Sequence, residues 1–182
     1  MGWAVTQIYL QAQHFFFFGS NAYAICMNGD QNDFVGPSTP TEDFLTHPDG
    51  TAIHLVTGLM WKRCAEGQTW NFGSCTESGW ASMFTWMSAL QHAHAESAFA
   101  GYDDWRLPNI KELGTIVEIS CSAPAINAAV FPGAPGGLFW SSSPNFSDSG
   151  KAWPIQFTHG ISYPAEKSSM ASVRLVRSVG GN

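Results

Sequence analysis

The hydrophobic and polar positions of this chain change period along its length. In the middle of the chain, apolar residues recur at the spacing of one helical face at Trp86, Ala89, Leu90 and Ala93. This pattern predicts a helix that begins near Thr85, whose hydroxyl can cap the first turn. His92 and His94 follow on the same helix. Because residues two apart on a helix point in different directions, both are predicted to face solvent without sharing a metal.

A second helix is predicted within residues 104–118, because Asn109 is followed three residues later by Glu112 in a capping-box arrangement. Pro108 prevents a helix from extending further back. The predicted buried stripe consists of Ile110, Leu113, Ile116 and Val117. Gly114 inside a helix costs about 1 kcal/mol relative to alanine, so we expect close packing to require it.

Short strands are predicted on both sides of the helices. Residues 51–63 favour two strands joined by a turn at Thr57-Gly58. Segments 138–142, 152–157 and 172–179 predict an antiparallel sheet in the last third of the chain. Pro154 cannot donate to a ladder, so its strand is expected to lie at an edge or to carry a bulge there.

Two segments show neither the helical nor the strand period. Residues 27–50 and 125–137 are rich in turn formers, and both are predicted to be irregular.

Composition limits the class of protein. The 182 residues suffice for one domain, and 45% of them are hydrophobic while only 12% are charged. The net charge is −6 and no run of basic residues occurs. These features argue against nucleic acid or an anionic membrane as the main partner.

The first 24 residues lack Asp, Glu, Lys and Arg, include four consecutive phenylalanines and end in Ala22-Tyr23-Ala24. An A-x-A ending favours an export signal over residues 1–24, which leaves one domain at residues 25–182. The positive start that such signals carry is missing. The alternative is an apolar N-terminal strand of the fold.

Four cysteines agree with export, since an even number after a signal-like segment is typical of two disulfides. Three pairings are possible. The short spacing favours Cys64 with Cys75, which leaves Cys26 to pair with Cys121. Zinc is the rival interpretation, but the chain contains no CxxC motif and the spacings are irregular.

No motif for catalysis stands out. Ser141, Ser142 and Ser143 lack the strand–Ser–helix context of a nucleophile elbow. His159 and Asp148 could complete a triad with them, but three such common residue types occur together by chance in a loop region. Asp103 and Asp104 are expected to bond to loop backbone and to pair with Arg106. A glycine-rich phosphate loop is also missing, so we expect no enzyme, cofactor or metal.

Several blocks occur together in one order: TGLMWKRC, GYDDWRLPNIKEL, PAIN with VFP, FWSSSP, AW with F, and VRLVR. They resemble the C-terminal domain family of the bacterial collagen-like adhesin Lcl across residues 55–178. The W-R-L-P block with its capped helix is also similar to the wider C-type-lectin-like superfamily, which includes formylglycine-generating enzymes and the variable proteins of diversity-generating retroelements. The resemblance implies an α+β fold, with two helices on small antiparallel sheets and a ligand surface on the C-terminal strands and loops.

The chain departs from these relatives in several respects. It carries no collagen-like repeat, and its acidic composition argues against the binding of sulfated polysaccharides. The calcium and sugar motifs of true C-type lectins are missing, and the cysteine surroundings of the formylglycine-generating site are not recognisable.

The comparison with retroelement variable proteins concerns residues from Ala152 onward. Residues typical of a fixed scaffold, such as Trp153, Ile155 and Phe157, alternate with residues that share no chemical character. The predicted ligand-binding residues are Phe146, Ser147, Ser149, Lys151, Pro154, Gln156, Thr158, His159, Ile161, Tyr163, Pro164, Glu166 and Met170. The alternation resembles a diversified cassette. The alternative is an ordinary irregular sheet surface.

We therefore expect a secreted or cell-surface, non-catalytic binding domain whose ligand is a protein or glycan on another cell or particle. The alternatives are an oxidoreductase of the formylglycine-generating kind and a purely structural envelope module.

Overall fold

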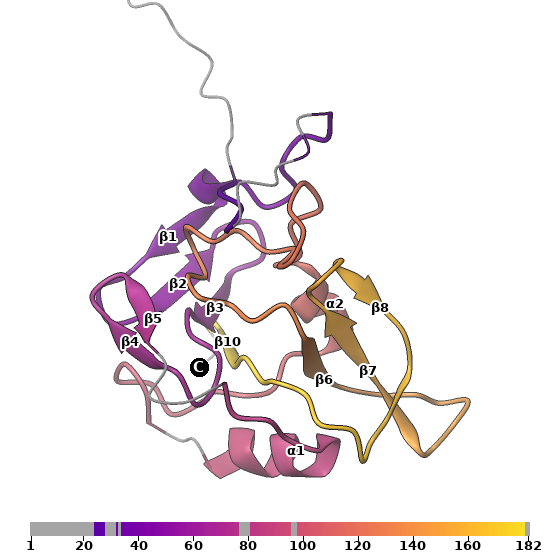
Figure 1. Ribbon diagram of the computed structural model, residues 1–182. Coiled ribbons are helices and arrows are strands. Elements are labelled where there is room, and N and C mark those ends of the chain that lie inside the picture. The colour runs from indigo at the N-terminus through magenta and orange to yellow at the C-terminus, as the bar shows by residue number, and fades with distance from the viewer. Residues whose placement is uncertain (1–23, 28–31, 33, 77–80, 96–97, 181–182) are drawn as a thin grey trace, which may run out of the picture.

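The computed structural model describes residues 24–27, 32, 34–76, 81–95 and 98–180. Of the predicted export signal, residues 1–23 lie outside this described part. Within the described residues the fold is α+β, with two α-helices and three small antiparallel sheets (Figure 1). Two disulfides cross-link it. The α+β prediction is confirmed.

The first sheet combines three strands from the first half of the chain with one from near its C-terminus, in the order β1 (Phe44–Thr46), β2 (Thr51–His54), β3 (Leu59–Lys62) and β10 (Val176–Ser178). β2 and β3 are the strands predicted around the Thr57-Gly58 turn, where Gly58 adopts a φ of +66°. β1 and the preceding 3-10 turn η1 (Thr41–Asp43) fall in the segment predicted to be irregular. That prediction was wrong for β1, since a three-residue strand is too short to show a period.

A hairpin of β4 (Thr69–Asn71) and β5 (Ser74–Thr76) forms the second sheet. Sequence reasoning missed it because both strands are short and polar. The hairpin is anchored by the disulfide between Cys64 and Cys75. Its turn requires left-handed backbone at Phe72 and Gly73, with φ of 39° and 106°.

The third sheet contains β6 (Leu138–Pro144), β7 (Lys151–Gln156), β8 (Ile161–Ser162) and β9 (Ala165–Glu166). β7 is central: β6 pairs along one side, while β8 and β9 pair with its two ends on the other. Pro154 falls between β8 and β9 and pairs with Trp140, where the register of β6 shifts. The irregularity expected beside a proline that cannot donate a ladder hydrogen bond is therefore present, but the extra residues lie in β6 rather than in the strand that contains Pro154.

The predicted strand over residues 172–179 is only partly correct. Ser172 forms a parallel bridge with Phe139 of β6, but the strand itself is β10, which pairs with β3 in the first sheet. The segment therefore connects the two larger sheets rather than completing the C-terminal one (Figure 1).

Both helices begin where the sequence predicts. In α1 (Trp86–Ala95), the Thr85 hydroxyl accepts a hydrogen bond from the Ser88 backbone N–H. In α2 (Ile110–Gly114), Asn109 and Glu112 form the predicted capping box. α2 ends sooner than the apolar stripe, so Ile116 and Val117 are buried beyond the helix.

The close packing expected at Gly114 is not present, because a Cβ there would meet no described atom within 4 Å. The short helix ends at Gly114 itself, so the residue is exposed near a turn instead of being pressed against a neighbour. The expectation came from assuming a longer helix.

A buried arginine lies where the two larger sheets meet. Arg174 is 1% exposed, and its Nη1 donates hydrogen bonds to the carbonyls of Lys62 and Arg63. Its guanidinium lies 4.7 Å from the centre of the Phe131 ring. Burial lowers the pKa of Arg174 to about 9; nearby Glu66 opposes this shift, and the Arg63 charge adds to it. Arg174 thus fixes the end of β3 through neutral carbonyls.

Both disulfides follow the predicted pairing. Cys26 joins Cys121 across 95 residues, and Cys64 joins Cys75 across 11. All four cysteines are therefore engaged, which excludes a zinc site built from them.

Candidate functional site

The predicted ligand surface lies on the third sheet and its loops, on the side of the molecule that carries β7 and β8 in Figure 1. The short strands β8 and β9 both pair with β7, and β7 follows the loop that leaves β6. This arrangement brings residues 146–166 into one continuous region. Met170 follows β9 by four residues and is exposed.

Most of the predicted residues are solvent-exposed, and three are half-buried. The exposed ones are Phe146, Ser147, Ser149, His159, Ile161, Tyr163, Pro164, Glu166 and Met170. The half-buried ones are Lys151, Gln156 and Thr158. Phe146 is 97% exposed, so a large apolar ring is displayed without packing. Such a ring offers contact area to a partner.

Two predicted residues belong to the scaffold instead. Pro154 is buried, so the expectation that it faces a partner was wrong: strict alternation along β7 fails at the register shift. The Thr158 hydroxyl donates a hydrogen bond to the Gly136 carbonyl, which ties the end of β7 to the loop before β6. Sequence alternation alone could not distinguish these positions from exposed ones.

The loop that carries Phe146 is held by its own polar groups. The side chain of Asn145 accepts from the Ser147 N–H, and that of Asp148 accepts from the Gly150 N–H. The Gly150 bond and then the Lys151 ammonium, 3.2 Å away, lower the pKa of Asp148. Asp148 in turn raises the pKa of Lys151.

The neighbouring Lys167 reinforces this order. Its Nζ donates to the Ser149 carbonyl at 2.8 Å and lies 4.4 Å from the centre of the Trp86 ring. The ring of Phe146 is thus presented by a loop with a defined shape.

The serine, histidine and aspartate residues considered for nucleophilic chemistry do not assemble. Asp148 precedes β7 and His159 follows it, so a strand of six residues, about 20 Å long, separates them. The serine hydroxyls bond to backbone: Ser141 donates to the Trp153 carbonyl, and Ser143 accepts from the Ile110 N–H.

The carboxylates near Trp105 form different pairs from those expected. Asp104 pairs with Arg177 at 2.5 Å, whereas Arg106 forms two hydrogen bonds with Glu112. The predicted pairing of Asp104 with Arg106 was wrong, because the Arg106 guanidinium is engaged by both oxygens of Glu112 and Arg177, from β10, reaches Asp104 instead. The hydrogen bond from Arg177 is the main cause that lowers the pKa of Asp104.

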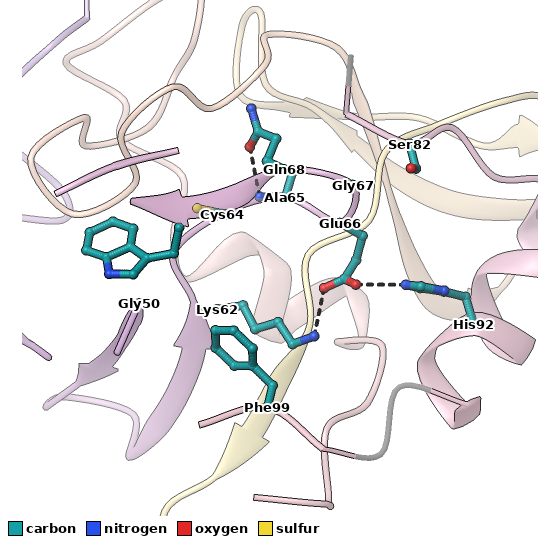
Figure 2. A pocket seen from close by; sticks show the side chains of 11 residues that line it. Gly50, Lys62, Cys64, Ala65, Glu66, Gly67, Gln68, Ser82, His92 and Phe99 are labelled. Carbon is teal, nitrogen blue, oxygen red and sulfur yellow. Dashed lines mark hydrogen bonds and ion pairs between the residues drawn. The ribbon is translucent and has the colours of Figure 1, made fainter. Parts of the chain in front are cut away.

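A pocket of about 360 Å³ lies between the end of β3, the β4–β5 hairpin and α1 (Figure 2). At its centre, the Glu66 carboxylate lies 3.1 Å from the Lys62 Nζ and 2.7 Å from the His92 Nε2. Lys62 and Glu66 side chains are each 7% exposed, whereas His92 is 26% exposed. His92 therefore contacts the pocket, and the prediction that it faces solvent was wrong.

Aromatic rings line the same pocket. Phe99 lies with its ring centre 4.8 Å from the Lys62 Nζ, and Trp70 forms another part of the lining. The Arg63 guanidinium lies 4.3 Å from the centre of the Trp70 ring, and the Trp70 indole N–H donates to the Pro48 carbonyl. Sequence reasoning missed this pocket, although Lys62 and Glu66 stand four residues apart in the sequence. Their meeting depends on the backbone turn after β3.

Within the described residues, no helix is both long and apolar enough to cross a membrane. The same residues contain no group of three or more His, Cys, Asp or Glu side chains arranged to hold a metal ion. The two disulfides are typical of proteins that fold in an oxidising environment.

Comparison with curated proteins finds no match to this chain. The family model of the Lcl C-terminal domain matches residues 50–177, well over half of the 182 residues. This range runs from the start of β2 to β10 and includes both helices, the Glu66 pocket and the third sheet. The chain therefore belongs to the Lcl C-terminal domain family.

Proposed function

We propose that this protein is an exported, non-catalytic, adhesin-like domain that binds a protein on another cell or particle through the exposed surface of its third sheet. The observation that carries the proposal is the exposure of chemically unlike side chains on an ordered scaffold. Phe146, Ile161, Tyr163 and Met170 all expose large apolar groups there. Aromatic residues and methionine are enriched at protein–protein interfaces, which favours a protein over a glycan at this surface.

Export is supported by the two disulfides and by the signal-like N-terminal segment. The C-type-lectin-like architecture implied by sequence resemblance agrees with a ligand-binding role. In that architecture the binding residues would lie on strands and loops whose side chains are not needed for the stability of the core. A non-catalytic role is supported by the pairing of all four cysteines, because a formylglycine-generating type of oxidoreductase requires reactive thiols.

A binding experiment tests the proposal. The purified domain is labelled and applied to protein arrays made from cell-surface and particle proteins of the organisms that share its habitat. A fourfold variant carries Phe146→Ser, Ile161→Ser, Tyr163→Ser and Met170→Ser. The matched control, Leu45→Ser with Val56→Ser, removes exposed apolar side chains from the first sheet and its turn.

We expect saturable binding that the fourfold variant weakens at least about tenfold and that the control retains. Equal binding by the fourfold variant would place the interface elsewhere and reject the proposal. Saturable binding to a glycan array instead, lost in the same variant, would reject a protein ligand while leaving the surface correct.

Diversification of this surface by a retroelement is a separate part of the proposal. It predicts an imperfect copy of the gene's 3′ end nearby in the DNA, differing mainly at adenines and adjoining a reverse transcriptase gene. Sequencing that neighbourhood decides the matter. A neighbourhood without the repeat removes diversification and leaves the binding surface unaffected.

A further inference from the structure

Two oppositely charged side chains are buried together at the floor of the Glu66 pocket. Lys62 and Glu66 stand four residues apart, and each side chain is 7% exposed. The Lys62 Nζ lies 3.1 Å from Glu66 Oε1. It is therefore no more than about 4.3 Å from the carboxylate carbon, since a C–O bond is about 1.2 Å long. Figure 2 shows Lys62 directed at one oxygen of the carboxylate and His92 at the other.

The backbone holds both residues in this position. The N–H of Lys62 donates to the Leu175 carbonyl, and that of Glu66 donates to the Val173 carbonyl. The Glu66 carbonyl in turn accepts from the Ser82 N–H. Both side chains therefore extend from backbone that is anchored to the same neighbouring segment. Groups held together in this way react as though present at about 10⁵–10⁸ M, provided that their atoms are aligned.

The surroundings of the pair favour loss of its charges. The Lys62 Nζ lies 4.8 Å and 5.8 Å from the centres of the Phe99 and Trp105 rings. Removing charged groups from water is costly even when they are paired. An amide between the two side chains would be neutral, so its formation would relieve that cost.

His92 supplies a third group. Its Nε2 lies 2.7 Å from Glu66 Oε2, and because a carboxylate only accepts hydrogen bonds, this nitrogen carries the proton. The N–H is thus directed at the oxygen that would become negatively charged if an amine added to the carboxyl carbon. A hydrogen-bond donor at such an oxygen stabilises the transition state. The three side chains therefore provide a nucleophile, an electrophile and an oxyanion donor.

We propose that Lys62 and Glu66 become joined in the folded protein by an amide bond between their side chains. The ammonium first passes one proton to Oε1, which leaves a neutral amine and a carboxylic acid. The nitrogen then forms a bond to Cδ, and His92 stabilises the charge on Oε2. The bond between Cδ and Oε1 breaks as a second proton moves from nitrogen to Oε1, and water leaves. No oxidant or other reactant is needed, and the cross-link is independent of the proposed protein-binding surface.

Mass spectrometry of the full chain tests the proposal. The chain is purified in urea, and half of it is refolded with oxidation of both disulfides and incubated overnight. The refolded half is then reduced, unfolded and weighed. We expect its mass to lie about 18 Da below that of the chain, because condensation of the two positioned groups releases one water. The half kept in urea should retain its full mass.

Trypsin locates the bond. The protease normally cleaves after Lys62 and after Arg63, which separates Lys62 from Glu66. An acylated Lys62 resists cleavage, and the cut after Arg63 leaves both pieces joined through the amide. Tandem mass spectrometry should therefore identify one branched peptide that contains Lys62 and Glu66.

Two variants separate this bond from other losses of water. Lys62→Arg retains a positive charge but has no amine that condenses, so it should keep its full mass. A succinimide at Asp49-Gly50 would lose the same mass, but it would survive this substitution. His92→Ala should slow bond formation about 100-fold, because it removes the oxyanion donor. Circular dichroism confirms that both variants fold.

The proposal is overturned if the refolded wild type keeps the full mass of the chain. It is equally overturned if Lys62→Arg loses the same water, or if trypsin separates Lys62 from Glu66 in the refolded wild type. A branched peptide in the wild type would establish the bond even if a variant failed to fold.

Discussion

The carboxylate of Glu118 accepts a hydrogen bond of 2.7 Å from the backbone N–H of Thr39, a residue 79 positions earlier in the chain. Glu118 is 0% exposed and also accepts from Ser38 and Ser120. A buried carboxylate is stable only when its lone pairs are satisfied, and here backbone and hydroxyl donors satisfy them. Glu118 therefore holds the segment before β1 against the turn after α2.

This arrangement predicts an acid-sensitive contribution to stability. Burial acts to raise the pKa of Glu118, but the hydrogen bonds from Ser120, Ser38 and Thr39 outweigh it and hold the pKa below its ordinary value of 4.5. The stabilising contribution of the ionised Glu118 to folding is therefore complete above pH 4.5, and it is lost as the pH falls through the lower pKa of the folded state. Glu118→Gln should reduce the free energy of unfolding at pH 7 by about 2–3 kcal/mol.

The measurement is urea unfolding of the wild type and Glu118→Gln at a series of pH values. Because the variant has no charge to lose at this position, the difference between the two proteins should shrink as the pH falls. Glu42→Gln, which removes an exposed carboxylate, serves as the matched control. A difference that stays constant down to the acid transition would contradict this account.

The two disulfides should contribute unequally to stability. Cross-linking limits the unfolded chain more when the closed loop is longer. For the loops of 95 and 11 residues, chain entropy gives about 4.7 and about 2.8 kcal/mol. Replacing Cys26 and Cys121 by serine should therefore lower the free energy of unfolding more than replacing Cys64 and Cys75.

Urea unfolding of the two double-serine variants under non-reducing conditions measures both values. A larger loss from the Cys64–Cys75 pair would show that this disulfide acts mainly on the folded hairpin rather than on the unfolded chain. That outcome would contradict the loop-length argument.

Local signals predicted the parts of the fold that depend on neighbouring residues. The capping box of Asn109 and Glu112, the cap at Thr85 and the turn at Gly58 each involve residues within four positions, and all three form. The position of Pro154 at an irregularity also followed from a local property, its missing N–H. Such features need no knowledge of the tertiary fold.

Features that depend on distant segments could not be predicted in this way. β10 pairs with β3 rather than with the strands that precede it in the chain, and Asp104 forms its ion pair with Arg177 rather than with the nearby Arg106. His92 contacts Glu66 because α1 packs beside the end of β3. These contacts are set by how the sheets and α1 pack together, and the sequence contains no local pattern that predicts them.

The surface of the third sheet should tolerate substitution. Phe146→Ser and Tyr163→Ser alter exposed side chains, and such changes usually shift the free energy of unfolding by about 0.5 kcal/mol or less. Pro154→Ser should cost more, since it alters a buried position at the register shift. Thermal unfolding of the single variants compares them. If Phe146→Ser destabilised the domain as much as Pro154→Ser, the division between scaffold and displayed residues would be wrong.

A glycine next to Trp70 connects the stability of the hairpin with the shape of the pocket. Gly50 adopts a φ of +88°, and a Cβ at this position would lie 2.7 Å from the Trp70 Cγ. Gly50→Ala must therefore strain the backbone and displace the indole, which should lower the free energy of unfolding by about 2–4 kcal/mol. Gly58→Ala is the matched control: its φ is +66°, but an added Cβ would meet nothing within 4 Å, so only about 1–2 kcal/mol of backbone strain applies.

Urea unfolding measures the two costs, and near-ultraviolet circular dichroism reports the tryptophan environment. We expect the near-ultraviolet spectrum to change in Gly50→Ala and to stay as in the wild type in Gly58→Ala. Equal destabilisation with unchanged spectra would show that Trp70 does not depend on the missing side chain at Gly50.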